Sequence, residues 1–201
     1  MLIHVGTKKI NTNRLLLRRF CVLDAEEAFR NWTNDEEVTK YLTWNPHGSL
    51  DVTKTLLNQW VLDYETPNTY NWAIELRDTG DLIGSIGIVS IDEENSSCEI
   101  GYCLSKQYWK KGIMSEALTA VINYLFSEVN FNRIVAKHYI DNIASGKVMA
   151  KCKMTHEGIL RQVRKGKNGE FISLAIYSIL KDEYEKYYNI DNHILASNSY
   201  Y

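Results

Sequence analysis

The stretch Ser97-Ser-Cys-Glu-Ile-Gly-Tyr-Cys-Leu-Ser105, continued by Lys106-Gln-Tyr-Trp-Lys-Lys-Gly-Ile-Met-Ser-Glu-Ala117, changes its hydrophobic period once. Residues 98–104 alternate between apolar and other side chains, which predicts a strand. From Ile113 to Phe126 the apolar residues recur at helical spacing. A basic turn ending at Gly112 lies between the two. A helix N-terminus after such a turn suits an anion, because its first N–H groups lack intrahelical acceptors and its dipole is positive there.

The composition indicates an ordinary globular protein. The chain has 201 residues, 45% of them hydrophobic, and a formal net charge of −2. One domain over residues 1–201 is expected, with no nucleic-acid or membrane partner. The four cysteines form no C-x-x-C pair and no leader is recognisable, so we expect reduced thiols and a cytoplasmic location. The five histidines are dispersed, so no metal site is expected.

The chain is predicted to be an α+β domain. Asp24 is the expected N-cap of a first helix that ends at Trp32, with Glu27 completing a capping box. Ser49 or Asp51 is expected to cap a helix whose apolar side carries Val52, Leu56, Leu57, Trp60 and Val61. A shorter helical piece over Asp35–Leu42 and a helix over Asp141–Lys151 complete the helices before a short helix and tail at 181–201. The predicted strands are Arg14–Phe20, Tyr70–Arg77, Leu82–Ile91, 98–104, Asn132–Tyr139, Met154–Arg164 and Glu170–Leu180.

Several motifs in this order resemble the GCN5-related N-acetyltransferase (GNAT) superfamily, over about residues 12–181. Within it, the chain is most similar to the branch of the ribosomal-protein N-terminal acetyltransferases RimJ and RimL. The motifs are Arg14-Leu-Leu-Leu-Arg18, Trp72-Ala-Ile, Leu82-Ile-Gly-Ser-Ile-Gly87, Glu99-Ile-Gly-Tyr102, Tyr108–Ala117, Asn142-x-x-Ser145 and Glu157-Gly-x-Leu-Arg161. The resemblance implies a mixed, mostly antiparallel twisted sheet flanked by helices. Its fourth and fifth strands would splay apart to form an acetyl-CoA cleft. The resemblance also allows a homodimer.

The resemblance further implies which residues hold acetyl-CoA. The pantetheine arm would bond to the backbone of residues 101–104, and the pyrophosphate would rest on N–H groups of residues 110–115. Lys110 stands where the family usually has glycine, and Met114 where it usually has a small residue. The residues expected at the cofactor are Gly101, Tyr102, Cys103, Leu104, Trp109, Lys110, Lys111, Gly112, Ile113, Met114, Ser115, Asn142 and Ser145.

Two residues are candidates for catalysis. Amine acetylation needs a neutral nucleophile, and amines with pKa values of about 8 to 10.4 must lose a proton first. Glu99 is the candidate base, with a water relay or a plain ion pair as alternatives. In similar proteins Asn142 binds pantetheine, and the Ser145 hydroxyl can protonate the CoA thiolate. The local sequence alone equally allows Asn142 as an N-cap and Ser145 as a helix-surface residue.

The expected function is therefore acetyl transfer from acetyl-CoA to a primary amine, either a protein N-terminus or a small molecule. An acid that some relatives carry after the Glu-Gly-x-Leu-Arg motif is replaced here by Gln162-Val-Arg164. A non-catalytic acyl-CoA-binding or sensing module is the alternative. The acidic run Asp35–Glu37 would favour a cationic acceptor, although a solvated helix face also explains it.

Overall fold

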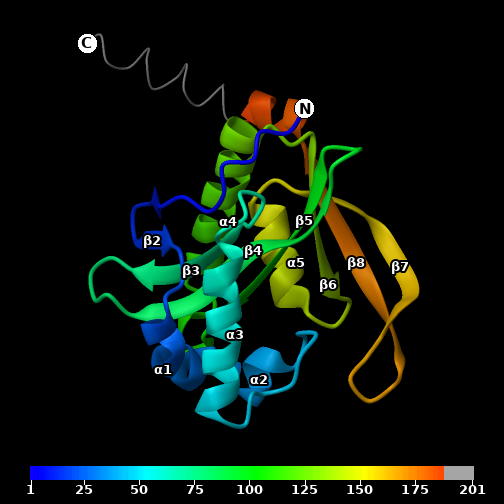
Figure 1. Ribbon diagram of the computed structural model, residues 1–201. Coiled ribbons are helices and arrows are strands. Elements are labelled where there is room, and N and C mark those ends of the chain that lie inside the picture. Colours follow the sequence, from blue (N-terminus) through cyan, green and yellow to red (C-terminus); the bar gives the residue numbers. More distant parts are fainter. Residues whose placement is uncertain (188–201) are drawn as a thin grey trace.

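The structure, a computed structural model, describes residues 1–187 (Figure 1). Within these residues, eight strands form one sheet in the order β1-β2-β3-β4-β5-β6-β8-β7. All neighbouring strands pair antiparallel except β5 and β6, which are parallel. The mixed, mostly antiparallel sheet is thus confirmed. The strands are β1 (Ile10–Asn11), β2 (Leu15–Arg18), β3 (Asn71–Leu76), β4 (Leu82–Asp92), β5 (Ser97–Leu104), β6 (Arg133–Tyr139), β7 (Thr155–Lys165) and β8 (Phe171–Leu180).

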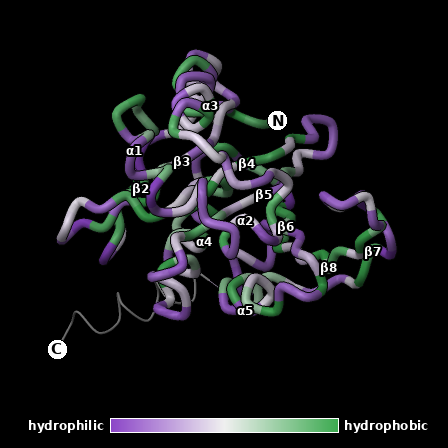
Figure 2. The backbone as a smooth tube through the Cα atoms, turned by 90° about the horizontal axis from the view of Figure 1, so that it is seen from below, coloured by the Kyte–Doolittle hydropathy of each residue, from purple (hydrophilic) through white to green (hydrophobic). Residues whose placement is uncertain are grey.

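Helices cover both faces of the sheet, as Figures 1 and 2 show from two directions. One face carries α1 and α3, and the other carries α4 and α5. The α-helices are α1 (Ala25–Ala28), α2 (Glu36–Thr39), α3 (Leu50–Asp63), α4 (Ile113–Tyr124) and α5 (Ile143–Lys151). Short 3-10 turns lie at Val22–Asp24 and Lys106–Tyr108, and π turns at Phe29–Thr33 and Leu125–Val129. Residues 181–187 are helical, as predicted, and the rest of the predicted tail lies outside the described residues.

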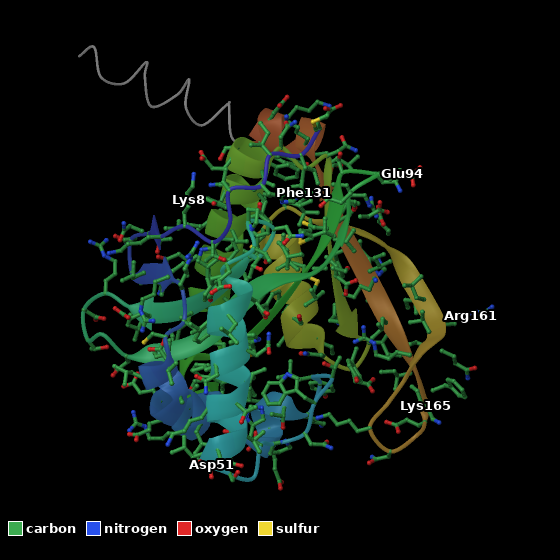
Figure 3. The ribbon with its side chains drawn as sticks, in the orientation of Figure 1. Lys8, Asp51, Glu94, Phe131, Arg161 and Lys165 are labelled. Atoms are coloured by element: carbon green, nitrogen blue, oxygen red, sulfur yellow. The ribbon has the colours of Figure 1, made fainter. Side chains whose placement is uncertain are left out.

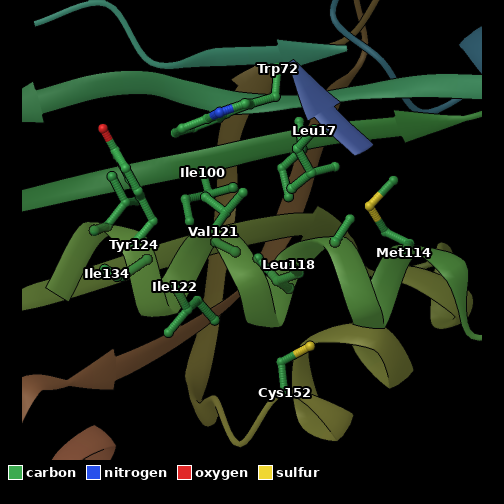
Figure 4. Close-up of a cluster of buried hydrophobic side chains, with 14 of the residues drawn as sticks. Leu17, Trp72, Ile100, Met114, Leu118, Val121, Ile122, Tyr124, Ile134 and Cys152 are labelled. Carbon is green, nitrogen blue, oxygen red and sulfur yellow. The ribbon is translucent and has the colours of Figure 1, made fainter. Parts of the chain in front are cut away.

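The larger core lies between the sheet and α4. Leu118, Val121 and Ile122 of α4 are completely buried. Val121 lies beneath Trp72 and Ile100 of the sheet, and Ile122 points from the other side of the helix (Figure 4). The apolar stripe that begins at Ile113 therefore faces the core, as its helical period predicts. At the outer edge of the sheet, β7 carries Arg161 and Lys165 on its surface (Figure 3), and such charges discourage edge-to-edge association.

The predicted helix details hold only in part. Asp24 is at the N-cap position of α1, as predicted, but its side chain makes no capping bond to that helix. A 3-10 turn from Val22 comes before α1, and the Asp24 carboxylate accepts from the Cys21 N–H at 2.8 Å. Asp24 also pairs with both terminal nitrogens of Arg18, each at 2.8 Å, so an ion pair with β2 holds its side chain. Glu27 accepts from the Leu82 N–H at 2.9 Å instead of closing a capping box. On α3, Val52 is 47% exposed and the neighbouring Thr53 is buried.

Glycines 84 and 87 mark a close approach between strands, as their positions in β4 suggest. A Cβ at residue 84 would lie 2.4 Å from the Cys103 carbonyl oxygen, and one at residue 87 would lie 2.6 Å from that of Tyr70. Side chains at these positions would force β3, β4 and β5 apart. The glycines therefore keep the central strands together where the cleft described below begins.

Candidate active site

The parallel strands β5 and β6 separate part-way along their length. Their ladder runs from the pair Ser97 and Arg133 to the pair Ile100 and Ala136, and stops there. Beyond it, β5 continues to Leu104 paired only with β4, while β6 continues to Tyr139 paired only with β8. The splay expected between the fourth and fifth predicted strands is thus confirmed. It leaves one backbone edge of each strand unpaired, which is where an extended ligand could add hydrogen bonds.

A cleft of about 730 Å³ opens at this splay. Residues from both strands, from the start of α5 and from the segments around α2 and α3 line it, and several of them are aromatic. Of the residues expected at the site, it brings together Glu99, Gly101, Tyr102, Cys103, Asn142 and Ser145. Asp35, Glu36 and Glu37 are not among its lining residues, and Glu37 instead pairs with Lys106. The aromatic lining consists of Trp32, Tyr41, Trp44, Trp60, Tyr70, Tyr102 and Tyr139.

Glu99 lies just before the splay and faces the cleft. Its Oε2 is 2.6 Å from the Nζ of Lys137, a residue one position past the end of the parallel ladder. The two side chains are 18% and 27% exposed, so the pair is partly withdrawn from water. The ammonium occupies one carboxylate oxygen and leaves the other without a hydrogen-bond partner among the described residues. Lys137 was not among the predicted site residues.

Tyr102, Ser145 and Asn142 form a connected polar group across the cleft floor. The Tyr102 hydroxyl lies 2.8 Å from Ser145 Oγ and donates to the Ser145 carbonyl at 3.2 Å. Burial raises the pKa of the Tyr102 phenol, and this keeps it protonated as a donor. Asn142 is the N-cap of α5, and its side-chain oxygen accepts from the Ser145 N–H at 3.3 Å. Ser145 is therefore a bonded cleft residue rather than a free helix-surface residue.

Two other predicted residues already have internal partners. The Cys103 thiol lies 3.2 Å from the Ser85 hydroxyl, and burial raises the pKa of this thiol, so it is not a ready nucleophile. The indole N–H of Trp109 donates to the Leu104 carbonyl at 2.8 Å. That contact uses the last carbonyl of β5, so Trp109 closes the strand end.

The loop before α4 has an unusual backbone. Lys110 has φ of 61° and Gly112 has φ of 74°, both in the left-handed region. Glu116 is the first residue of α4 whose N–H reaches a backbone carbonyl, that of Gly112 at 3.1 Å. Within the described residues, the N–H groups of Ile113, Met114 and Ser115 have no protein acceptor. They form the positive end of a twelve-residue helix, the kind of site that binds phosphate.

Met114 does not narrow this anion site. Its side chain is 6% exposed and packs into the core beneath the sheet (Figure 4). Lys111 directs its ammonium over the Tyr108 ring at 5.2 Å, while its carbonyl points elsewhere and is bound by Arg14. The sequence pattern did not single out Arg14 for this site, since the contact joins residues 97 positions apart.

The positive φ of Lys110 should be measurable as strain. A non-glycine residue in this region costs about 1 kcal/mol or more, which glycine avoids. We therefore expect Lys110→Gly to be more stable than Lys110→Ala by about 1 kcal/mol in urea unfolding. Lys111 is not among the positive-φ residues, so Lys111→Gly should be less stable than Lys111→Ala. If the glycine and alanine variants had the same order of stability at positions 110 and 111, the positive φ of Lys110 would not be a source of strain.

Comparison with known proteins agrees with this geometry. The family model described as "Acetyltransferase (GNAT) domain" matches residues 14–155. The uncharacterized N-acetyltransferase p20 of Bacillus licheniformis is 36% identical over 174 residues, covering 86% of this chain and 96% of p20. The crystal structure of a GNAT-family acetyltransferase from Bacillus anthracis has a TM-score of 0.77 and 29% identity, covering 88% of this chain and all of that one.

A structure of RimL, the ribosomal L7/L12 alpha-N-protein acetyltransferase, in complex with coenzyme A has a TM-score of 0.77. It covers 88% of this chain and 99% of RimL at 22% identity, so this likeness supports the fold. The open sheet and these similarities together define an acetyltransferase. The chain belongs to the GNAT family. Among residues 1–187, no helix is long and apolar enough to cross a membrane.

Proposed function

We propose that the chain transfers an acetyl group from acetyl-CoA directly to a primary amine. The observations that carry the proposal are the unpaired edge of β5 at the cleft and, after the loop that follows β5, the free N–H groups at the start of α4. A thioester arm that is extended at one end and carries a pyrophosphate at the other matches both features. The coenzyme A bound to RimL supports the choice of ligand.

In this proposal the predicted residues contact the two ends of the cofactor or support the loop between them. Pantetheine bonds to the free backbone groups of Gly101–Cys103, and the pyrophosphate binds N–H groups between Lys110 and Ser115. Because the Asn142 oxygen caps α5, its Nδ2 remains to donate to a pantetheine carbonyl. The hydrogen bond from the Trp109 indole to the Leu104 carbonyl supports the start of the loop.

Glu99 is the proposed base, acting on the amine directly or through one water. The amine nitrogen forms a bond to the acetyl carbonyl carbon while its proton passes to the carboxylate. A backbone N–H of the splayed β5 donates to the oxyanion, and collapse breaks the carbon–sulfur bond. The departing thiolate takes a proton from the Ser145 hydroxyl, which is hydrogen-bonded to Tyr102 and regains a proton from solvent water.

The role of Ser145 should be modest. A thiol of pKa about 8.5 leaves with little acid assistance near neutral pH. We therefore expect Ser145→Ala to lower kcat by about 10-fold or less, measured at saturating acetyl-CoA and acceptor. Tyr102→Phe, which removes the partner hydroxyl and keeps the ring, should have a similar effect. A loss above about 100-fold for Ser145→Ala alone would make its hydroxyl an essential acid.

The acceptor is proposed to enter on the side of α2 and α3, whose segments supply the aromatic lining. RimL acts on a ribosomal protein, so a protein N-terminus is the first acceptor to test, and small amines are the second. A homodimer and a cytoplasmic location are part of the same proposal, the latter because the four cysteines are free thiols in the structure.

The proposal is tested by following CoA thiol release from acetyl-CoA with N-terminal peptides and primary amines. Release that depends on one acceptor class, with mass spectrometry locating the acetyl group on its amine, is the expected result. Tight calorimetric binding of CoA without turnover on any acceptor would instead favour the sensing module. Absence of CoA binding would refute the proposal itself.

A further inference from the structure

We infer that Arg14 is a positioning residue for the phosphate-binding loop, a role that rests on the proposed use of acetyl-CoA. Arg14 comes directly before β2 and lies far from the loop in sequence. Its Nη1 donates to the Lys111 carbonyl at 3.0 Å, so one side chain reaches the backbone of the loop between its two left-handed residues, Lys110 and Gly112.

The Arg14 side chain is itself held in place by Glu116 in the first turn of α4. The Nε of Arg14 donates to Glu116 Oε2 at 2.7 Å, and its backbone N–H donates to Oε1 at 2.8 Å. Thr12 Oγ1 also donates to Oε1, at 2.6 Å, so the carboxylate accepts three hydrogen bonds in all. The side chain of Glu116 is 19% exposed, and that of Arg14 is 43% exposed. The contacts therefore join three elements: the entry to β2, the loop and the start of α4.

Peptide-bond geometry connects the Arg14 contact to the anion site. A trans peptide is planar, so the carbonyl of one residue and the N–H of the next point in opposite directions. Arg14 holds the Lys111 carbonyl toward itself and thereby turns the Gly112 N–H the other way, toward the side on which the proposed pyrophosphate lies. Without this contact, the peptide that joins Lys111 to the left-handed Gly112 could rotate and present its carbonyl oxygen to a phosphate.

The charges support the same conclusion. A carboxylate in the first turn of α4 would repel a pyrophosphate at that helix end unless its charge were compensated. Burial works against ionisation of Glu116, but the bonds from Thr12 and Arg14 outweigh it and lower the pKa of the carboxyl. Glu116 thus serves as the anchor of Arg14, and Arg14 supplies the compensating charge.

The test compares ligands with and without phosphate. Calorimetry would measure CoA and pantetheine, which lacks the pyrophosphate, on wild type, Arg14→Met and Arg14→Lys. We expect Arg14→Met to raise the Kd of CoA by about 10-fold or more and to leave that of pantetheine within about 2-fold, because one charge-assisted bond is lost. Arg14→Lys should weaken CoA binding nearly as much, since an ammonium cannot bridge Glu116 and Lys111 as the guanidinium does.

A matched control separates positioning from general stability. Arg133→Met removes another ion-paired arginine, bound to Glu157 between β6 and β7, and should leave the ratio of the two Kd values unchanged. Equal weakening of both ligands by Arg14→Met, or full CoA binding by Arg14→Lys, would overturn the inference. Absence of CoA binding by the wild type would instead refute the proposed function, so the two failures are distinguishable.

Discussion

Replacing Glu99 by glutamine should lower kcat/KM for the amine acceptor by about 100-fold or more and leave the Kd of CoA within about 2-fold. A general base contributes roughly 10²- to 10⁴-fold to a proton-transfer step, and the amide cannot accept the proton. Glutamine keeps the shape of the side chain in the cleft beside Lys137. The measurement is steady-state turnover with the acceptor found in the thiol-release assay, together with calorimetric binding of CoA.

The ion pair with Lys137 needs its own control, because its loss could also perturb the cleft. Lys137→Met frees the carboxylate and keeps the base, so its effect on kcat/KM should be much smaller than that of Glu99→Gln. Glu157→Gln disrupts a comparable pair, with Arg133, whose two residues do not line the cleft, and it should leave kcat/KM unchanged. Full turnover by Glu99→Gln would exclude the carboxylate as base and leave the water relay.

Most of the sheet and helices could be predicted because each element buries one face. The change in hydrophobic period between Leu104 and Ile113 predicts the boundary between β5 and α4. Helix ends were less predictable. Asp24 has the side chain of an N-cap, but a bidentate pair with Arg18 competes for it, and that partner lies on a strand.

In the candidate site, too, some features could be predicted from the sequence and others could not. The anion site after Gly112 can be predicted from local sequence, because a helix start leaves its first N–H groups without acceptors, whereas the role of Gly101 is implied only by the resemblance to the family. The side-chain partners cannot be predicted in this way. Glu99 meets Lys137 only because β5 and β6 are parallel, and Arg14 meets Lys111 only because β2 lies near the start of α4. One sequence carries no local signal for pairs created by chain topology.

Gly146→Ala should destabilise the protein by about 1 to 2 kcal/mol, although alanine normally favours a helix by about 1 kcal/mol. Gly146 is buried inside α5, and a Cβ there would lie 2.7 Å from Nε2 of His138. The ring cannot easily move away, since it is 8% exposed and its Nδ1 donates to the Tyr139 carbonyl at 2.8 Å. Overpacking of this kind costs about 1 to 3 kcal/mol beyond the helix gain. Urea unfolding measures the change.

A double-mutant cycle with His138→Ala tests whether the contact between residue 146 and His138 causes the destabilisation. In a His138→Ala background the ring is gone, so Gly146→Ala should become stabilising by about 1 kcal/mol and the coupling energy should be about 2 to 3 kcal/mol. Ala144→Gly at an exposed position of α5 calibrates the helix preference alone. If Gly146→Ala destabilised both backgrounds equally, the contact with His138 would not be the cause. The sign change would show that the glycine next to Ser145 is required by a β6 side chain, which fixes how closely α5 approaches the cleft.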